Sequence, residues 1–179
     1  MAGLPTPAAP SARAVARPPA GDAAPGRVDV LLACSSGGHL LQLHALRQAW
    51  AGRSSLWVSD DTSDVRSLLA GERLVLAHGP TPRNVLTLLR NLVLAWRVCR
   101  AARPKVIVTT GAATAVPFAW LGRALGARVV YVESLTRINS PSLSLRLISP
   151  VASRVYVQWP ELAAGRRGAR YVGTVIGGP

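Results

Sequence analysis

Short apolar runs alternate along this chain with longer amphipathic segments. The run VDVLLA at residues 28–33 is apolar almost throughout and predicts a buried strand, and residues 39–51 then carry Leu and Ala at helical spacing. The same two patterns predict further strands at 55–59, 73–77, 105–110, 128–132, 154–157 and 170–172, and further helices at 62–70, 83–102, 114–125 and 142–152. This alternation predicts an α/β fold with a Rossmann-like, doubly wound parallel sheet.

The first 26 residues have a different composition. They consist mainly of Pro, Ala and Gly with few large apolar side chains, which predicts a disordered tail. They also lack the apolar core of about 7–15 residues that a secretory signal needs. We therefore expect one Rossmann-like domain over residues 27–179, without a signal peptide or a transmembrane segment.

The segment at residues 83–103 has a wide apolar face and a basic face. The apolar face comprises Leu88, Leu89, Leu92, Val93, Ala95 and Trp96, and the basic face comprises Arg83, Arg90, Asn91 and Arg97. A basic amphipathic helix with Leu and Trp is typical of helices that lie in the plane of a membrane, and here Leu89, Trp96, Arg90 and Arg97 would make the contact. An ordinary helix packed on the sheet is the alternative.

The formal net charge of +13 narrows the choice of partners. The charge is nearly all arginine and is spread along the chain, without a basic block interleaved with aromatic residues, so we expect no nucleic-acid partner. An anionic membrane or a phosphate-bearing lipid would attract such a chain by about 1 kcal/mol per basic residue near the surface. Genome base composition is the other explanation for the arginine content.

Cysteine and histidine patterns exclude two further classes of site. Cys34 and Cys99 form no CxxC motif, and the three histidines form no HExxH motif. The sequence therefore predicts neither a disulfide framework nor a metal site.

The stretch SSGGH, from Ser35 to His39, joins the first predicted strand to the first predicted helix. Glycines there allow positive φ angles and let the backbone N–H groups of a helix start face an anion. Neither GxGxxG nor GxxxxGK[ST] is present, so an ordinary strand-to-helix turn remains an alternative. His39 follows at the carboxyl end of the strand, where open α/β sheets hold their ligands.

Two later stretches end strands in a similar way. TTGAAT places a turn at Gly111 and a helix cap at Thr114, and Glu133 directly follows a buried strand and precedes Arg137 and Asn139. We expect the carboxylate, the arginine and the histidine to converge on one crevice open to solvent. Such a group of side chains can bind a phosphate and activate a hydroxyl.

Four of these segments together resemble the asparagine-linked-glycosylation-fourteen family, namely SSGGHLLQL, TTGAATAVP, VESLTRINSPSLS and VYVQWPEL. The resemblance spans about residues 28–176. Members are the non-catalytic, membrane-recruiting subunits of a two-subunit UDP-N-acetylglucosamine transferase that acts on a lipid-diphosphate sugar. Bacterial relatives serve exopolysaccharide assembly, where UDP-glucuronate is another donor. The resemblance implies the amino-terminal, acceptor-side half of a GT-B glycosyltransferase, similar to the lipid-linked peptidoglycan N-acetylglucosaminyltransferase.

The resemblance also implies partners and roles. A separate subunit would bind the UDP-sugar donor, and this chain alone would be inactive, with no further cofactor. By the resemblance, the loop that faces the acceptor and donor diphosphates comprises Ser36, Gly37, Gly38 and His39, with His39 as the base. Gly111 and Thr114 would lie beside the lipid diphosphate. The acceptor sugar would be held, or the loop organised, by Glu133, Arg137 and Asn139, and Glu133 is the second catalytic candidate.

Family members from eukaryotes carry an amino-terminal transmembrane helix, which the Pro-rich residues 1–26 do not resemble. Membrane contact is therefore expected from residues 83–103, the basic surface or a partner, and we expect a peripheral location on the cytoplasmic face of the plasma membrane. Two other functions stay open. A stand-alone nucleotide- or NAD-binding module would use Asp60 or Asp61 for ribose hydroxyls. A non-catalytic membrane adaptor would need neither His39 nor Glu133.

Overall fold

Seven strands form one parallel sheet, in the order β3-β2-β1-β4-β5-β6-β7. The computed structural model describes residues 26–79, 85–166 and 168–175, and the tail predicted at 1–26 therefore lies almost wholly outside the described residues. The strands are β1 (Val30–Ala33), β2 (Ser55–Asp60), β3 (Leu74–Ala77), β4 (Val106–Thr109), β5 (Arg128–Val132), β6 (Arg154–Val157) and β7 (Ala169–Tyr171). The predicted parallel α/β fold is confirmed.

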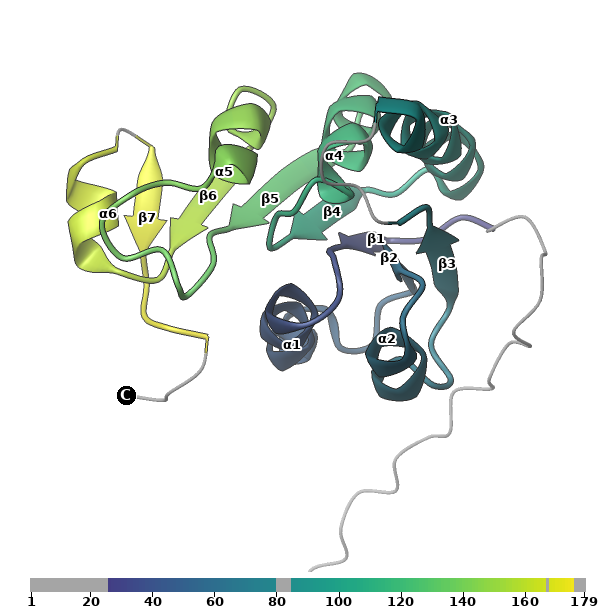
Figure 1. Cartoon of the computed structure of the whole chain (residues 1–179), viewed down its shortest axis with the longest axis horizontal. Coiled ribbons are helices and arrows are strands. Elements are labelled where there is room, and N and C mark those ends of the chain that lie inside the picture. The colour runs from purple at the N-terminus through teal and green to yellow at the C-terminus, as the bar shows by residue number, and fades with distance from the viewer. Residues whose placement is uncertain (1–25, 80–84, 167, 176–179) are drawn as a thin grey trace, which may run out of the picture.

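Helices cover the two faces of the sheet unequally (Figure 1). They are α1 (Gly38–Ala45), the 3-10 helix η1 (Arg47–Trp50), α2 (Ser63–Leu68), α3 (Val85–Ala102), α4 (Ala115–Ala124), α5 (Leu143–Ile148) and α6 (Pro160–Ala164). Helices α3, α4 and α5 lie side by side on one face, whereas α1 and α2 lie on the other. Among the described residues, no helix combines the length and apolar character that crossing a bilayer requires.

Two hydrophobic cores follow from the alternation of side chains along each strand. On β1, Leu31 and Ala33 point into the core under α3, α4 and α5, whereas Val30 and Leu32 point into the core under α1 and α2. Because both faces of β1 are covered, the strand is apolar throughout, which is the signal that the sequence analysis used.

One part of the sheet is bare on the α1 side. Within the part of the chain that the structure describes, no helix covers β4, β5 and β6 there, and a trough of about 740 Å³ lies over them. Its floor consists of Val106, Val108, Val130, Val132 and Tyr156, and the segment at 172–175 lines one side. The sheet therefore presents an open apolar surface that this part of the chain does not cover.

Helix α3 packs on the sheet, as the alternative interpretation of residues 83–103 expected, but it does so through small and polar residues. Its buried residues include Asn91, Ala95 and Cys99, whereas Leu89 and Trp96 are 53% and 44% exposed. Small side chains let the helix approach its neighbours closely, so the large apolar residues face outward. Arg83 lies outside the described residues.

Asn91 and Ala95 were both assigned to the wrong face of this helix. Asn91 is fully buried, because its side chain accepts a hydrogen bond from the His78 backbone N–H (2.8 Å) and donates one to the His78 carbonyl (2.9 Å). Burial of an amide costs little when both of its ends are bonded. Ala95 belongs to the buried face and not to the apolar surface.

Two predicted helices differ in length, and one helix was missed. The helix predicted at 39–51 is α1 followed by η1, and the helix predicted at 142–152 ends at Ile148. Helix α6 was missed because it has only five residues. Its first residue is Pro160, whose fixed φ suits the first turn of a helix.

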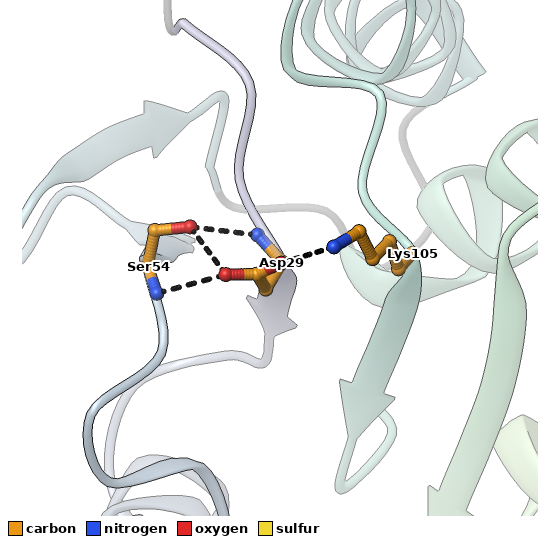
Figure 2. Close-up of polar contacts among 3 residues, drawn as sticks. All are labelled: Asp29, Ser54 and Lys105. Carbon is orange, nitrogen blue, oxygen red and sulfur yellow. Dashed lines mark hydrogen bonds and ion pairs between the residues drawn. The ribbon is translucent and has the colours of Figure 1, made fainter.

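Asp29 ties together the amino ends of the three adjacent strands β2, β1 and β4 (Figure 2). Its carboxylate pairs with the Lys105 ammonium at 2.8 Å and accepts hydrogen bonds from the Ser54 hydroxyl at 2.9 Å and the Ser54 N–H at 3.3 Å. The hydrogen bond to Lys105, which has the largest effect, and those to Ser54 lower the pKa of Asp29 from 3.8 to about 2. The charged carboxylate is therefore favoured in the folded state.

Replacement of Asp29 by Asn should make the stability of the fold depend less on pH in acidic solution. A carboxyl whose pKa is lower in the folded state stabilises the fold above its unfolded pKa of 3.8 and loses this contribution as the pH falls toward about 2. We expect wild type to unfold at a higher temperature than Asp29→Asn at neutral pH, and the difference to shrink as the pH falls through this window. Thermal unfolding followed by circular dichroism measures it. Glu72→Gln, at another carboxylate, is the control; an equal effect there would contradict the prediction.

Candidate functional site

The candidate site lies where the strand order reverses, between β1 and β4. Open α/β sheets bind their ligands at the carboxyl ends of the strands at this point. Three loops start from neighbouring strands there: the glycine loop (36–39) after β1, the β4 loop (110–114) and the β5 loop (133–142). The parallel sheet thus brings the three sequence-predicted segments to one edge.

The glycine loop makes the predicted tight turn. Gly37 has a φ of 71° and occupies the N-cap position of α1, where a side chain would be strained. However, the Gly37 N–H donates a hydrogen bond to the Asp64 carboxylate at 2.9 Å, and this contact lowers the pKa of Asp64 together with the larger effect of Thr62. The N–H that we assigned to a diphosphate is therefore already bound to an anionic side chain. Ser36 is half-buried and Gly38 is exposed on the same loop.

His39 lies beside the other two loops. Its backbone carbonyl accepts a hydrogen bond from the Thr110 hydroxyl at 2.9 Å. Burial lowers the pKa of its imidazole below 6.5, against smaller opposing effects of the Thr110 backbone and the charge of Glu133. Nδ1 is buried and has no hydrogen-bond partner among the described residues. A half-buried imidazole with a lowered pKa is neutral at neutral pH and can accept a proton.

Gly111 is required by close packing. Its φ is 99°, and a Cβ there would lie 2.7 Å from the Tyr131 hydroxyl and 3.2 Å from the Ser144 Cβ. The Gly111 N–H donates to the Thr109 hydroxyl, and the Ala112 N–H donates to the Ser144 hydroxyl. The β4 loop is therefore held against β5 and α5.

Thr114 was predicted to cap α4, and this is wrong. It occupies the N-cap position, but its φ of −59° is helical and its side chain makes no capping hydrogen bond. The hydroxyl instead donates to the Asp60 carboxylate at 2.8 Å, at the end of β2. One oxygen of Asp60 is thus already engaged, which weakens the alternative in which Asp60 binds the hydroxyls of a ribose.

Glu133 is fully buried, so the prediction that it faces an open cleft is wrong. One carboxylate oxygen accepts hydrogen bonds from the Ser134 N–H (2.8 Å) and the Tyr131 hydroxyl (3.2 Å). The other accepts from the Ser142 N–H and the Ser142 hydroxyl, both at 3.0 Å. With four donors on two oxygens, the carboxylate has little capacity left to take a proton from a substrate. This geometry favours the loop-organising role over the catalytic one.

The β5 loop carries the two other predicted contacts. Arg137 and Asn139 are both exposed, and the charge of Arg137 acts on His39 and on Tyr131. Arg137 is therefore an accessible cation close to the imidazole. Asn139 lies on the same loop, two residues farther along.

Two buried glutamines at this edge were missed by the sequence analysis. Gln42 lies within α1 between Leu40 and Leu43, and Gln158 directly follows β6. Their signals were available: a polar residue beside buried helix positions, and a polar residue at a strand end, as with Glu133.

The edge combines a half-buried imidazole whose pKa is lowered, His39, with an exposed arginine, Arg137. Glu133 holds the loop that carries Arg137. Among the described residues, no group of three or more His, Cys, Asp and Glu side chains could hold a metal ion.

Comparison with known proteins gives relatives of one kind. The chain is 35% identical over 101 residues to the UDP-N-acetylglucosamine transferase subunit ALG14 of Yarrowia lipolytica, covering 53% of this chain and 47% of that protein. It is 29% identical to the human subunit of the same name, with the same two coverages. The matches thus span about half the length of these curated relatives.

Solved structures with the same fold include MurG and a UDP-GlcNAc 2-epimerase. MurG of Acinetobacter baumannii superposes with a TM-score of 0.66 at 18% identity, over 84% of this chain and 46% of that one. UDP-GlcNAc 2-epimerase of Methanocaldococcus jannaschii superposes with a TM-score of 0.64 at 12% identity, over 81% and 45%. At these identities the likeness concerns the fold alone, and it confirms the predicted Rossmann-like domain of GT-B type.

The family model described as "Oligosaccharide biosynthesis protein Alg14 like" matches residues 73–175. This range is more than half of the chain and includes the β4 loop, the β5 loop and helix α3. The glycine loop lies outside it. The chain belongs to the Alg14 family.

Proposed function

We propose that this protein is one subunit of a two-subunit, UDP-sugar-dependent glycosyltransferase that extends a lipid-diphosphate-linked saccharide. It would bind the acceptor and recruit the enzyme to the membrane, while a separate subunit binds the donor. Family membership and relatives named as UDP-N-acetylglucosamine transferase subunits support this, with N-acetylglucosamine as the favoured sugar and glucuronate as the other candidate.

The observation that carries the proposal is the position of His39, a neutral base beside the accessible cation Arg137 at the sheet's switch point. The acceptor hydroxyl would attack the anomeric carbon of the donor as UDP leaves. One C–O bond forms, the bond from that carbon to the UDP oxygen breaks, and His39 takes the hydroxyl proton. General-base assistance of this kind contributes about 10²–10⁴-fold.

The bare face of the sheet supports a partner subunit. The trough over β4, β5 and β6 is floored by valines, and exposed apolar surface of this kind marks sites of interaction. We assign it to the donor-binding subunit, because it opens beside the strands whose carboxyl ends form the candidate site.

Helix α3 supports recruitment to a membrane. Its outward apolar face consists of Val85, Leu86, Leu88, Leu89, Leu92, Val93 and Trp96, each more than 40% exposed. Arg90 and Arg97 are exposed beside a hollow of about 310 Å³ that Leu89 and Val93 also line. Apolar side chains flanked by arginines fit the boundary between lipid headgroups and acyl chains.

A non-catalytic adaptor is the second candidate, and two observations favour it. Asp64 already occupies the Gly37 N–H, and Glu133 already has four donors. An adaptor needs the trough and α3 but not the chemistry of His39. The experiments below separate the two candidates.

The purified chain alone should release no UDP from a UDP-sugar, whereas the chain co-purified with its partner should. UDP release in the presence of a lipid-diphosphate-linked acceptor measures this, with the partner identified as the protein that co-purifies. Leu46→Arg, in the trough, should abolish co-purification, whereas Leu41→Arg, exposed on α1 away from the trough, should not. Robust turnover by the chain alone would contradict the proposal.

Replacement of His39 by Ala should lower turnover by the assembled pair by about 10²-fold or more, with folding and partner binding intact. Because the pKa of His39 is below 6.5, wild-type turnover should be level above pH 6.5 and fall only when more acidic solution protonates the imidazole. His44→Ala, on the same helix, is the matched control. The adaptor would be favoured if His39→Ala lowered turnover by tenfold or less, or if the variant kept the pH profile of the wild type.

Replacement of Leu89 and Trp96 by Gln should weaken binding to anionic vesicles by at least about tenfold, because both side chains would leave the bilayer interface. Both are exposed, so the circular dichroism spectrum should not change. Vesicle co-sedimentation measures binding, and Leu41→Gln, an equally exposed leucine on the opposite face of the sheet, is the control. Equal binding by wild type and the double variant would exclude α3 as the membrane contact.

A further inference from the structure

Two buried glutamine side chains join the trough to the candidate site. Gln42 on α1 is 5% exposed and Gln158 after β6 is 2% exposed. The two amides bond directly to each other, because Gln158 Nε2 donates to Gln42 Oε1 at 2.8 Å. They lie 116 positions apart in the sequence, so this bond joins distant segments.

Backbone partners at both ends fix the orientation of the Gln158 amide. Its Oε1 accepts a hydrogen bond from the Val175 N–H at 2.8 Å, which requires oxygen at that position. Its Nε2 also donates to the Glu133 carbonyl at 2.9 Å, which requires nitrogen. Gln158 and Val175 both line the trough.

The Gln42 amide is fixed in the same way on the site's side. Its Oε1 accepts from the Leu135 N–H of the β5 loop at 2.8 Å. Its Nε2 donates to the Gly38 carbonyl of the glycine loop at 3.1 Å. A single hydrogen-bonded chain therefore runs from Val175 through both amides to Leu135 and Gly38.

We propose that Gln42 and Gln158 are positioning residues that couple the trough to the glycine loop and the β5 loop. A subunit seated in the trough would fix the segment at 172–175, and the two amides would transmit this to the loops that carry His39 and Arg137. The catalytic part of this inference rests on the proposed function. Occupation of the trough would thereby set the geometry of the candidate site.

Neither the Gln42 nor the Gln158 side-chain amide can shift alone in this series of hydrogen bonds. Both side chains are almost completely buried, so water has little access to either amide. Loss of one amide leaves the other with one hydrogen bond fewer and removes a partner from the backbone groups of the loops, which then have to move to find new partners. The network is consequently sensitive to a change at either end.

Hydrogen exchange on the whole chain tests the coupling without any assay of activity. The Leu135 amide contacts Gln42 and not Gln158, and the Val175 amide contacts Gln158 and not Gln42. Gln158→Met should nevertheless accelerate exchange at Leu135, and Gln42→Met should accelerate exchange at Val175. Each effect should be about tenfold, the change expected for one lost hydrogen bond.

Asn91→Leu is the matched control. Asn91 is a buried amide of α3, on the other face of the sheet from α1, and its two backbone partners are the N–H and carbonyl of His78. Its loss should lower overall stability without a selective change at Leu135 or Val175. Absence of the two cross-effects, or the same effects in Asn91→Leu, would overturn the coupling.

Kinetics of the assembled pair test the positioning role. Both glutamine variants should lower kcat by about 10²-fold, as small misplacements of catalytic groups do, and leave the KM for the donor and the affinity for the partner within twofold. Unchanged kcat despite accelerated exchange would reduce the two residues to structural ones and overturn the positioning claim. If the wild-type pair shows no turnover, the proposed function fails, and the exchange experiment still decides the coupling.

Discussion

Burial of the Glu133 carboxylate is the constraint on which the candidate site depends. A carboxylate without a charged partner is costly to bury unless its oxygens are fully hydrogen-bonded. Here the donors come from the strand that precedes Glu133 and from the start of α5, so Tyr131 and Ser142 have to close around it. The loop between these two residues is thereby fixed at both ends, and it carries the exposed side chain of Arg137.

The fold could be predicted from the sequence because short, largely apolar strand segments alternate with amphipathic helical segments. That signal located all seven strands of the sheet to within a few residues. It failed for α3, where hydropathy and packing disagree: the helix docks through Ala95 and Cys99, which are small, and through Asn91, which is polar but fully bonded. Hydropathy does not record whether a neighbouring backbone offers partners to an amide.

The candidate site could be predicted only in part. Residues at strand ends were located correctly, because parallel strands bring their carboxyl ends to one edge. The hydrogen-bond partners of each side chain or backbone group could not be predicted, since they come from segments far apart in the sequence. Asp64 bonds to Gly37, Thr114 to Asp60, and Gln158 to Gln42, and none of these pairs is signalled by spacing along the chain.

The inverted packing of α3 has a consequence for how such a protein can diversify. Residues that hold the helix to the domain are separate from those it presents outward, so substitutions on the outer face leave the core intact. Leu89 and Trp96 can be exchanged for other side chains at little cost in folding, whereas Ala95 cannot become larger without displacing the helix. The outer face of α3 is thus free to adapt to bilayers of different composition while the interior stays constant.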